Sequence, residues 1–250
     1  AGFAAGDLVL IDGGGNDAAD LVGAYLSASK DGGANYKGLL TTLLPASMVD
    51  AAFAGGATGM AQVGGAYMVG LADKFSASIN ADVLGKGAQR VAILNLPGIY
   101  NTPRLQQLLG GIAASAGPAA SAQIQGLVKG WIEAFNAKLA ANFAGNDKVV
   151  VVDFYTSLND QVAHPEQFAL TNAKNTACPI TGVGTDGLPT YTFATCTAAS
   201  LSAMAPPAGA TGGADWWKSY AFSDSFHPTP YGHQLLSQLV ARSIAQAGWL

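Results

Sequence analysis

The sequence is poor in charged residues, in histidines and in cysteines, and each scarcity excludes a class of function. Only 11% of the 250 residues are charged, the formal net charge is −4, and the twelve lysines and arginines form no basic run. Nucleic acids are held mainly by clustered basic side chains, so no nucleic-acid partner is expected. The three histidines form no H-x-H or H-x-x-x-H pair. Neither a metal ion nor another cofactor is therefore predicted.

The only cysteines are Cys178 and Cys196, too few for a structural zinc site. The stretch between them is dense in Thr, Gly, Pro and Ala, and a disulfide would tie it down as a loop. Closing a loop of this length stabilises a fold by roughly 3 kcal/mol. The pairing would indicate an oxidising compartment, whereas the alternative is a pair of unpaired, buried thiols.

No membrane span or signal peptide is predicted. Residues 1–6 have no basic start of the kind that opens a signal peptide. The uncharged run 51–72 is long enough to cross a bilayer, but it is rich in glycine and contains Thr58 and Gln62. These residues favour a buried Ala/Gly helix instead.

Half of the residues are hydrophobic, and their pattern predicts an α/β fold. The short apolar runs 8–11, 91–94 and 149–152 read as buried strands, and segments of helical periodicity separate them. Strands that alternate with helices predict a parallel sheet covered on both faces, a three-layer α/β/α arrangement in one domain of residues 1–250. Residues 156–220 break the pattern, and an irregular region of that length is usually functional, as a lid or binding loop.

The clearest helical stripes bracket this sheet. One helix is predicted around residues 60–79 and another around 124–139, and a last helix begins near Pro230 with Thr229 as its N-cap. Asn16 or Asp17 can cap the helix that follows the first strand.

Two polar segments carry candidate chemistry. The first is Gly14-Gly15-Asn16-Asp17, directly after a strand, where ligands collect in parallel α/β sheets. Gly14 permits a tight turn, and the Asn16 amide is a neutral donor suited to charge that develops on a substrate oxygen. The alternative for this segment is a helix cap.

The second segment is Asp224-Ser225-Phe226-His227-Pro228, just before the last helix. A carboxylate three residues before a histidine can fix its tautomer and stabilise the imidazolium, as a general base requires. The alternative is a surface aspartate beside a loop histidine. His233 is expected to serve packing or hydrogen bonding, and His164 to be structural or close to substrate.

Together these segments resemble the GDSL, or SGNH, hydrolases, in particular the secreted bacterial esterases, lipases and phospholipases. Residues 14–17 match the family's G-x-N-D block, and residues 224–227 match its D-x-x-H block. The segments 96–99, 102–103 and 152–155 resemble the ends of the fourth and fifth strands in that branch. The resemblance implies a flavodoxin-like fold, His227 as base, Asp224 as its acid partner, Asn16 in the oxyanion hole, and Gly14 and Asp17 in support. It also implies a secreted, periplasmic or outer-membrane-associated protein.

The sequence departs from the family in its first blocks. No G-D-S block and no G-x-S-x-G elbow occurs among the 250 residues, so the nucleophilic serine is unknown. Two strands that should lie beside the first strand are also absent. We therefore expect the chain alone to be inactive, with an N-terminal complementing fragment or an edge-pairing partner chain beside the strand at 8–11.

Several functions remain open. The first is an esterase or lipase that acts on a small-molecule ester or lipid through an acyl-enzyme. A phospholipase or lipid acyltransferase would use the same chemistry. The alternative from another class is a non-catalytic binding or scaffold domain that lost its nucleophile. The Trp216-Trp217 pair could line an acyl pocket with the disulfide loop, or simply pack beneath it.

Overall fold

The computed structural model describes residues 2–184 and 187–250, and contacts group the chain into two compact units. The first unit comprises Ala1–Pro97, Gly126–Asp153 and Ser243–Leu250. The second comprises Gly98–Gln125 and Phe154–Arg242. The single domain expected from the sequence stays a prediction.

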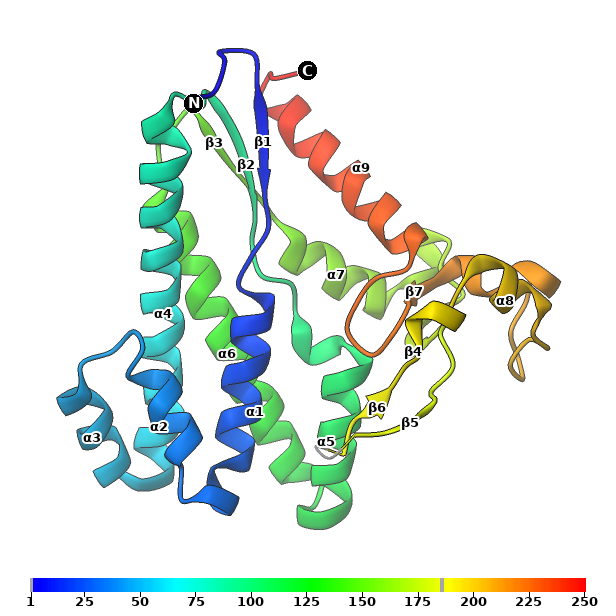
Figure 1. Cartoon of the computed structure of the whole chain (residues 1–250), viewed down its shortest axis with the longest axis horizontal. Helices are drawn as coiled ribbons and strands as arrows, with labels where there is room; N and C mark the ends of the chain where they lie inside the picture. The colour runs from blue at the N-terminus through cyan, green and yellow to red at the C-terminus, as the bar shows by residue number, and fades with distance from the viewer. Residues whose placement is uncertain (1, 185–186) are drawn as a thin grey trace. The chain divides into compact units, whose positions relative to one another are not determined.

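A three-stranded parallel sheet lies in the first unit, in the order β1-β2-β3 (Figure 1). Its strands are β1 (Leu8–Ile11), β2 (Arg90–Leu94) and β3 (Val149–Val152). Val9 pairs with Val91, and Val91 pairs in turn with Val149. The three predicted strands are thus confirmed, and with them the α/β class and the parallel sheet.

The first strand is less buried than the sequence predicts. Leu8 is 40% exposed and Leu10 is 56% exposed, whereas the last four residues of β2 are buried. The reason is position, because β1 pairs with β2 on one side and with no other strand among the described residues. The interpretation of residues 8–11 as a buried strand is therefore wrong for the described structure, in which β1 forms an edge.

Helices make up most of the rest of the first unit. They are α1 (Gly15–Asp31), α2 (Ala34–Leu40), α3 (Ala46–Ala54), α4 (Gly56–Asp82) and the part of α6 (Pro118–Asn142) from Gly126 onward. The predicted stripes are confirmed on α4, where Val63 and Tyr67 are buried, and on α6, where Trp131 and Phe135 are buried. Gly64 lets the α6 indole approach α4, because a Cβ there would lie 2.3 Å from the Trp131 ring.

The run 51–72 is divided between α3 and α4 at Gly55. No helix in residues 2–184 and 187–250 has the length and hydrophobicity needed to cross a bilayer.

The second unit consists mainly of short elements. These are α5 (Pro103–Ala116), α7 (Phe154–Ala163), β4 (Asn172–Thr176), β5 (Gly182–Val183), β6 (Pro189–Thr190), α8 (Ala198–Ala203) and β7 (Tyr220–Phe222), with most of α9 (Pro230–Gln246). β4 and β7 pair in parallel, and β5 and β6 form an antiparallel hairpin. Residues 156–220 are thus more ordered than predicted, since they contain most of α7, the β5–β6 hairpin, α8 and β4, which pairs with β7 from Tyr220 onward.

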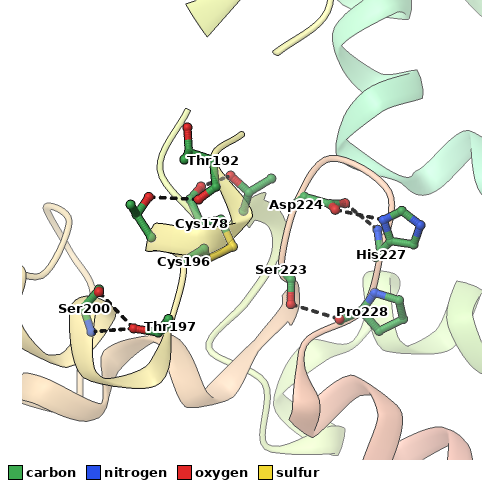
Figure 2. The surroundings of a disulfide bond; sticks show 11 residues. Cys178, Thr192, Cys196, Thr197, Ser200, Ser223, Asp224, His227 and Pro228 are labelled. Carbon is green, nitrogen blue, oxygen red and sulfur yellow. Dashed lines mark hydrogen bonds and ion pairs between the residues drawn. A yellow bond between two sulfur atoms is a disulfide. The ribbon is translucent and has the colours of Figure 1, made fainter. Parts of the chain in front are cut away.

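Cys178 and Cys196 form a disulfide, with their Cα atoms 5.4 Å apart (Figure 2). This distance falls within the usual range for a bridged pair. The bridge joins the residues just after β4 to those before α8, so it closes the β5–β6 hairpin into a loop. The predicted disulfide is confirmed, and the alternative of two free thiols is not.

Candidate active site

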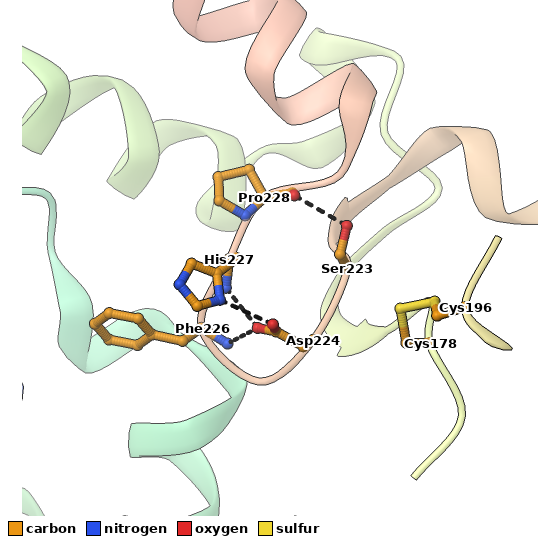
Figure 3. A network of polar contacts seen from close by, with 7 residues as sticks. All are labelled: Cys178, Cys196, Ser223, Asp224, Phe226, His227 and Pro228. Atoms are coloured by element: carbon orange, nitrogen blue, oxygen red, sulfur yellow. Dashed lines mark hydrogen bonds and ion pairs between the residues drawn. A yellow bond between two sulfur atoms is a disulfide. The ribbon is translucent and has the colours of Figure 1, made fainter. Parts of the chain in front are cut away.

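Asp224 and His227 lie on the loop between β7 and α9, and they are joined by a hydrogen bond. The Asp224 Oδ2 atom lies 2.8 Å from Nδ1 of His227. The other carboxylate oxygen, Oδ1, accepts the backbone N–H groups of Phe226 and His227, each at 2.7 Å (Figure 3). One buried carboxylate therefore fixes both the course of the loop and the orientation of the ring.

The same loop is held at its two ends by further hydrogen bonds. Ser223 donates its N–H to the His227 carbonyl at 2.8 Å and its hydroxyl to the Pro228 carbonyl at 2.9 Å. The N–H of Arg104, at the start of α5, donates to the carbonyl of Ser225 at 2.8 Å. These bonds hold the two ends of the loop together and attach its middle to the start of α5.

Thr229 fastens the loop to the last helix. Its hydroxyl donates to the Tyr220 carbonyl at 2.5 Å and accepts the N–H of Gly232 at 3.0 Å. This second bond is an N-cap, so the predicted cap and the predicted start of α9 at Pro230 are both confirmed. Gly232 must be small, since a Cβ there would lie 2.9 Å from the Ala221 carbonyl oxygen.

Burial differs sharply between the two members of the pair. The Asp224 side chain is 7% exposed, whereas that of His227 is 68% exposed in this structure. When Nδ1–H of a neutral imidazole donates to a carboxylate, Nε2 carries the free lone pair. The arrangement can therefore accept a proton at Nε2 and stabilise the resulting imidazolium, which is what a general base for a hydroxyl nucleophile must do.

Asn16 lies in the first turn of α1, and the helix-cap alternative for it is wrong. α1 begins at Gly15, its N-cap is Gly14 with φ of 91°, and no side chain caps it. Neither Asn16 nor Asp17 is the cap, because the helix begins two residues earlier than a cap at Asn16 would require. Asn16 is exposed and makes no side-chain hydrogen bond with the described residues, so its amide is available to another partner.

Gly14 is required by this turn for two reasons. Its positive φ is a conformation that other residues adopt only at a cost, and a Cβ would lie 3.2 Å from Cδ2 of Leu96. The same turn borders a hollow of about 240 Å³ that Gly14 lines together with Asp17, Lys74, Phe75 and others. Asp17 thus faces a mixed polar and apolar hollow beside the predicted oxyanion residue.

The charge of Asp17 also acts on the buried phenol of Tyr67. Burial raises the pKa of Tyr67, a hydrogen bond with Thr42 opposes the rise, and the charges of Asp17 and Asp20 add to it. Asn16 belongs to the first unit, and Asp224 and His227 belong to the second. Their convergence on one cleft stays a prediction.

The remaining candidates have other surroundings. The predicted packing or hydrogen-bonding role of His233 is wrong, because this residue is exposed on α9 and its ring bonds to no described residue. His164 is exposed at the start of a 3-10 helix. Trp216 and Trp217 are buried, and they donate to the Leu201 carbonyl and the Ser202 hydroxyl. The packing alternative for the tryptophan pair is therefore the one observed.

Two polar links at the carboxyl ends of the strands escaped the sequence analysis. Asn95, directly after β2, donates its amide to Asp153, directly after β3, at 3.0 Å. Asn136 of α6 bonds to the backbone of Leu96. The Asn95–Asp153 bond could have been anticipated, because each residue directly follows a strand. Nothing in the sequence around Asn136 indicated its bonds to the backbone of Leu96.

No group of three or more potential ligands that could hold a metal ion occurs in the described part of the chain. None of the curated proteins matches the chain. A family model described as GDSL-like Lipase/Acylhydrolase matches residues 3–240, which is nearly the whole sequence. The chain therefore belongs to the GDSL-like Lipase/Acylhydrolase family, whose members are hydrolases of esters and lipids.

Proposed function

We propose that this chain supplies the general base and one oxyanion donor of a serine hydrolase that cleaves carboxylic esters. The observation that carries the proposal is the bond from His227 Nδ1 to the buried Asp224 carboxylate, which leaves the other ring nitrogen on the exposed side chain. In this mechanism Nε2 of His227 takes the proton of a serine hydroxyl as the oxygen attacks the ester carbonyl. Asp224 stabilises the imidazolium that results.

Asn16 acts at the same step. As the tetrahedral intermediate forms, its carboxamide donates to the oxyanion, and the Gly14 turn fixes where that amide points. His227 then returns the proton to the departing alcohol. Water, deprotonated by the same imidazole, attacks the acyl-enzyme and releases the acid.

The nucleophilic serine comes from a segment outside these 250 residues, on an N-terminal fragment or on a partner chain. The outer edge of β1 supports this proposal, because Leu8 and Leu10 are exposed and β1 has a strand partner on one side only among the described residues. A strand added in parallel at this edge would cover both leucines and deliver its carboxyl end beside the Gly14 turn.

The disulfide supports a location where thiols are oxidised, which we propose to be outside the cytoplasm: secreted, periplasmic or at the outer membrane. A phospholipase or a lipid acyltransferase would use the same residues, and the products formed from a phospholipid with and without an added alcohol distinguish these activities from a simple esterase.

A fluorophosphonate probe tests the proposal, because it forms a covalent bond only with an activated serine. In protein isolated from its natural source, we expect the label on a serine outside residues 1–250, identified by mass spectrometry of the labelled peptide. His227→Ala should lower labelling and ester turnover by several orders of magnitude, because nucleophile and base act as a unit. His233→Ala is the matched control, since that exposed histidine lies six residues away and has no part in the mechanism.

Two outcomes would contradict the proposal. A label on a serine within these 250 residues would show that the nucleophile is misplaced. Source-isolated protein that takes no label and turns over no ester would favour the non-catalytic scaffold domain.

A further inference from the structure

The disulfide lies one hydrogen bond away from the β7–α9 loop that carries the proposed base. Beyond the end of β4, the N–H of Ala177 donates to the Phe222 carbonyl at 2.9 Å, and the N–H of Cys178 donates to the Ser223 carbonyl at 2.8 Å. Ser223 is the residue directly before Asp224. It lies between the bridge and the loop in both close views (Figure 2, Figure 3).

Ser223 takes part both in the bond with Cys178 and in the closure of the loop. Its carbonyl accepts the N–H of Cys178, whereas its own N–H donates to the His227 carbonyl. Its hydroxyl donates to the Pro228 carbonyl. The place of Ser223 therefore determines how the two ends of the loop meet, and where the Asp224 carboxylate starts from.

The bond from Cys178 to Ser223 lies at the end of a paired segment. β4 ends at Thr176, and Pro179 has no N–H with which the pairing could be extended. The outermost bonds of a paired segment open at a lower free energy than those of its interior. On backbone pairing alone, Cys178 is thus among the first residues to separate from β7 and the loop.

The disulfide opposes this separation. Cys178 is 5% exposed and is bonded to Cys196, which packs against a buried cluster of the second unit. This cluster consists of Ala177, Leu201, Trp216, Trp217 and Tyr220. Tyr220 is also the first residue of β7. The bridge therefore ties Cys178 to the same packed group that holds the strand before the loop.

We propose that the Cys178–Cys196 disulfide is a positioning element for His227. The bridge keeps Cys178 bonded to Ser223. Ser223 in turn keeps the Asp224 carboxylate against Nδ1 of the ring. The inference rests on the proposed function only where it calls His227 a base, because what it concerns is the hydrogen bonding of the ring. A bridge that served only to close the β5–β6 hairpin could be removed without any change at that ring.

The test removes the bridge from the purified chain and observes His227 by NMR. Dithiothreitol transfers two electrons and two protons to the bridge, so that the S–S bond gives two thiols and the reagent becomes a cyclic disulfide. The ring ¹⁵N shifts report which nitrogen of the neutral imidazole carries the proton. In the oxidised chain we expect this proton on Nδ1, where Asp224 accepts it.

Reduction should convert part of the His227 rings to the tautomer with the proton on Nε2. The N–H groups of Phe226 and His227, which donate to Asp224, should exchange with solvent about tenfold faster or more. Reoxidation should restore both signals. The double variant Cys178→Ala/Cys196→Ala should reproduce the reduced state in the absence of any reductant.

Thr181→Ala is the matched control. The Thr181 hydroxyl donates to the Thr190 carbonyl and accepts the hydroxyl of Thr192, both within the hairpin that the bridge closes. The variant therefore loosens the hairpin and keeps the bridge. It should leave the tautomer of His227 and the exchange of its N–H unchanged.

Three results would overturn the proposal. The first is a His227 ring that is unchanged both by reduction and in the double variant, which would leave the bridge as a closure of the hairpin alone. The second is the same change at His227 in Thr181→Ala, which would assign the effect to the hairpin. The third is equal acceleration of exchange at the N–H of Val91, which bonds to Lys148 in the first unit, because the bridge would then stabilise the whole chain. No readout here requires turnover, so a failure is distinct from a failure of the fluorophosphonate experiment.

Discussion

The side-chain amide of Asn136 forms two hydrogen bonds with the backbone of Leu96, forty residues earlier in the chain. Its Oδ1 accepts the Leu96 N–H at 2.8 Å, and its Nδ2 donates to the Leu96 carbonyl at 2.9 Å. Leu96 is 1% exposed, and its side chain lies against Gly14. The amide on α6 thus satisfies a buried backbone just beyond the end of β2 and fixes the residue on which the Gly14 turn rests.

Replacing Asn136 with leucine should leave the N–H and the carbonyl of Leu96 without partners. Buried groups left unpaired in this way cost about 1–3 kcal/mol each, so for the two groups we expect a loss of about 2–6 kcal/mol in the free energy of unfolding. Urea titration followed by circular dichroism measures this loss. Asn142→Leu is the control on the same helix, because that amide also makes two bonds, to Asp73 and Ser76, but at a partly exposed site. Equal losses in the free energy of unfolding would show that the bonds to the Leu96 backbone stabilise the fold no more than those of a partly exposed amide.

Gly14 and Gly15 are adjacent glycines with opposite requirements. Gly14→Ala introduces a Cβ at φ of 91° and places it 3.2 Å from Leu96, so unfolding should become easier by about 1–3 kcal/mol. Gly15→Ala meets nothing within 4 Å and stands at the start of α1, where alanine is the better helix former. That variant should be neutral or more stable by up to about 1 kcal/mol. Thermal unfolding of both variants measures these differences. A Gly14→Ala variant as stable as the original chain would contradict the positive φ of Gly14 and its close approach to Leu96.

The sequence was informative where structure is local. Runs of four apolar residues marked the three parallel strands, and the 3.6-residue stripe marked α6, because burial in a core selects those periods directly. The Asp224–His227 bond was predictable for the same reason, since its two partners lie three residues apart.

Long-range structure was less accessible. β4 has the sequence Asn-Ala-Lys-Asn-Thr, which shows no strand pattern, and its order comes from pairing with β7 more than forty residues later. The exposure of β1 depends on which strands lie beside it, and no property of Leu8 or Leu10 reveals that. Asn136 looks like any polar residue on a helix until the backbone of Leu96 is placed against it.

Thr229 should be needed for the stability of the loop that holds His227. Thr229→Ala removes the N-cap of α9 and leaves the Tyr220 carbonyl unpaired, which predicts a loss of about 1–3 kcal/mol. Thr229→Ser keeps the hydroxyl and should lose less than about 1 kcal/mol. Hydrogen exchange gives the local readout, since the N–H groups of Phe226 and His227, both bonded to Asp224, should exchange faster in the alanine variant alone. Equal exchange in the two variants would rule out a role for the Thr229 hydroxyl in holding the loop.

Alkaline pH should destabilise the protein through its buried phenols, above all through Tyr36. This residue is fully buried and donates its hydroxyl to the Met60 carbonyl at 2.9 Å, and burial raises its pKa well above the ordinary value of about 10. The folded state therefore holds the proton more tightly than the unfolded state. The stabilisation is complete below about pH 10 and is lost as pH rises from the unfolded pKa toward the folded one, by up to about 1.4 kcal/mol per pH unit for one group.

Tyr36→Phe removes this titration along with one hydrogen bond. The variant should be less stable than the original chain at pH 8, but its stability should fall less steeply between pH 10 and 11. Some slope should remain, because burial also raises the pKa of Tyr25 and Tyr67. Urea unfolding at pH 8, 10 and 11 measures the two slopes. If they are parallel, the phenol of Tyr36 ionises as easily in the folded chain as in the unfolded one, and its hydroxyl cannot be buried against Met60 as the structure has it.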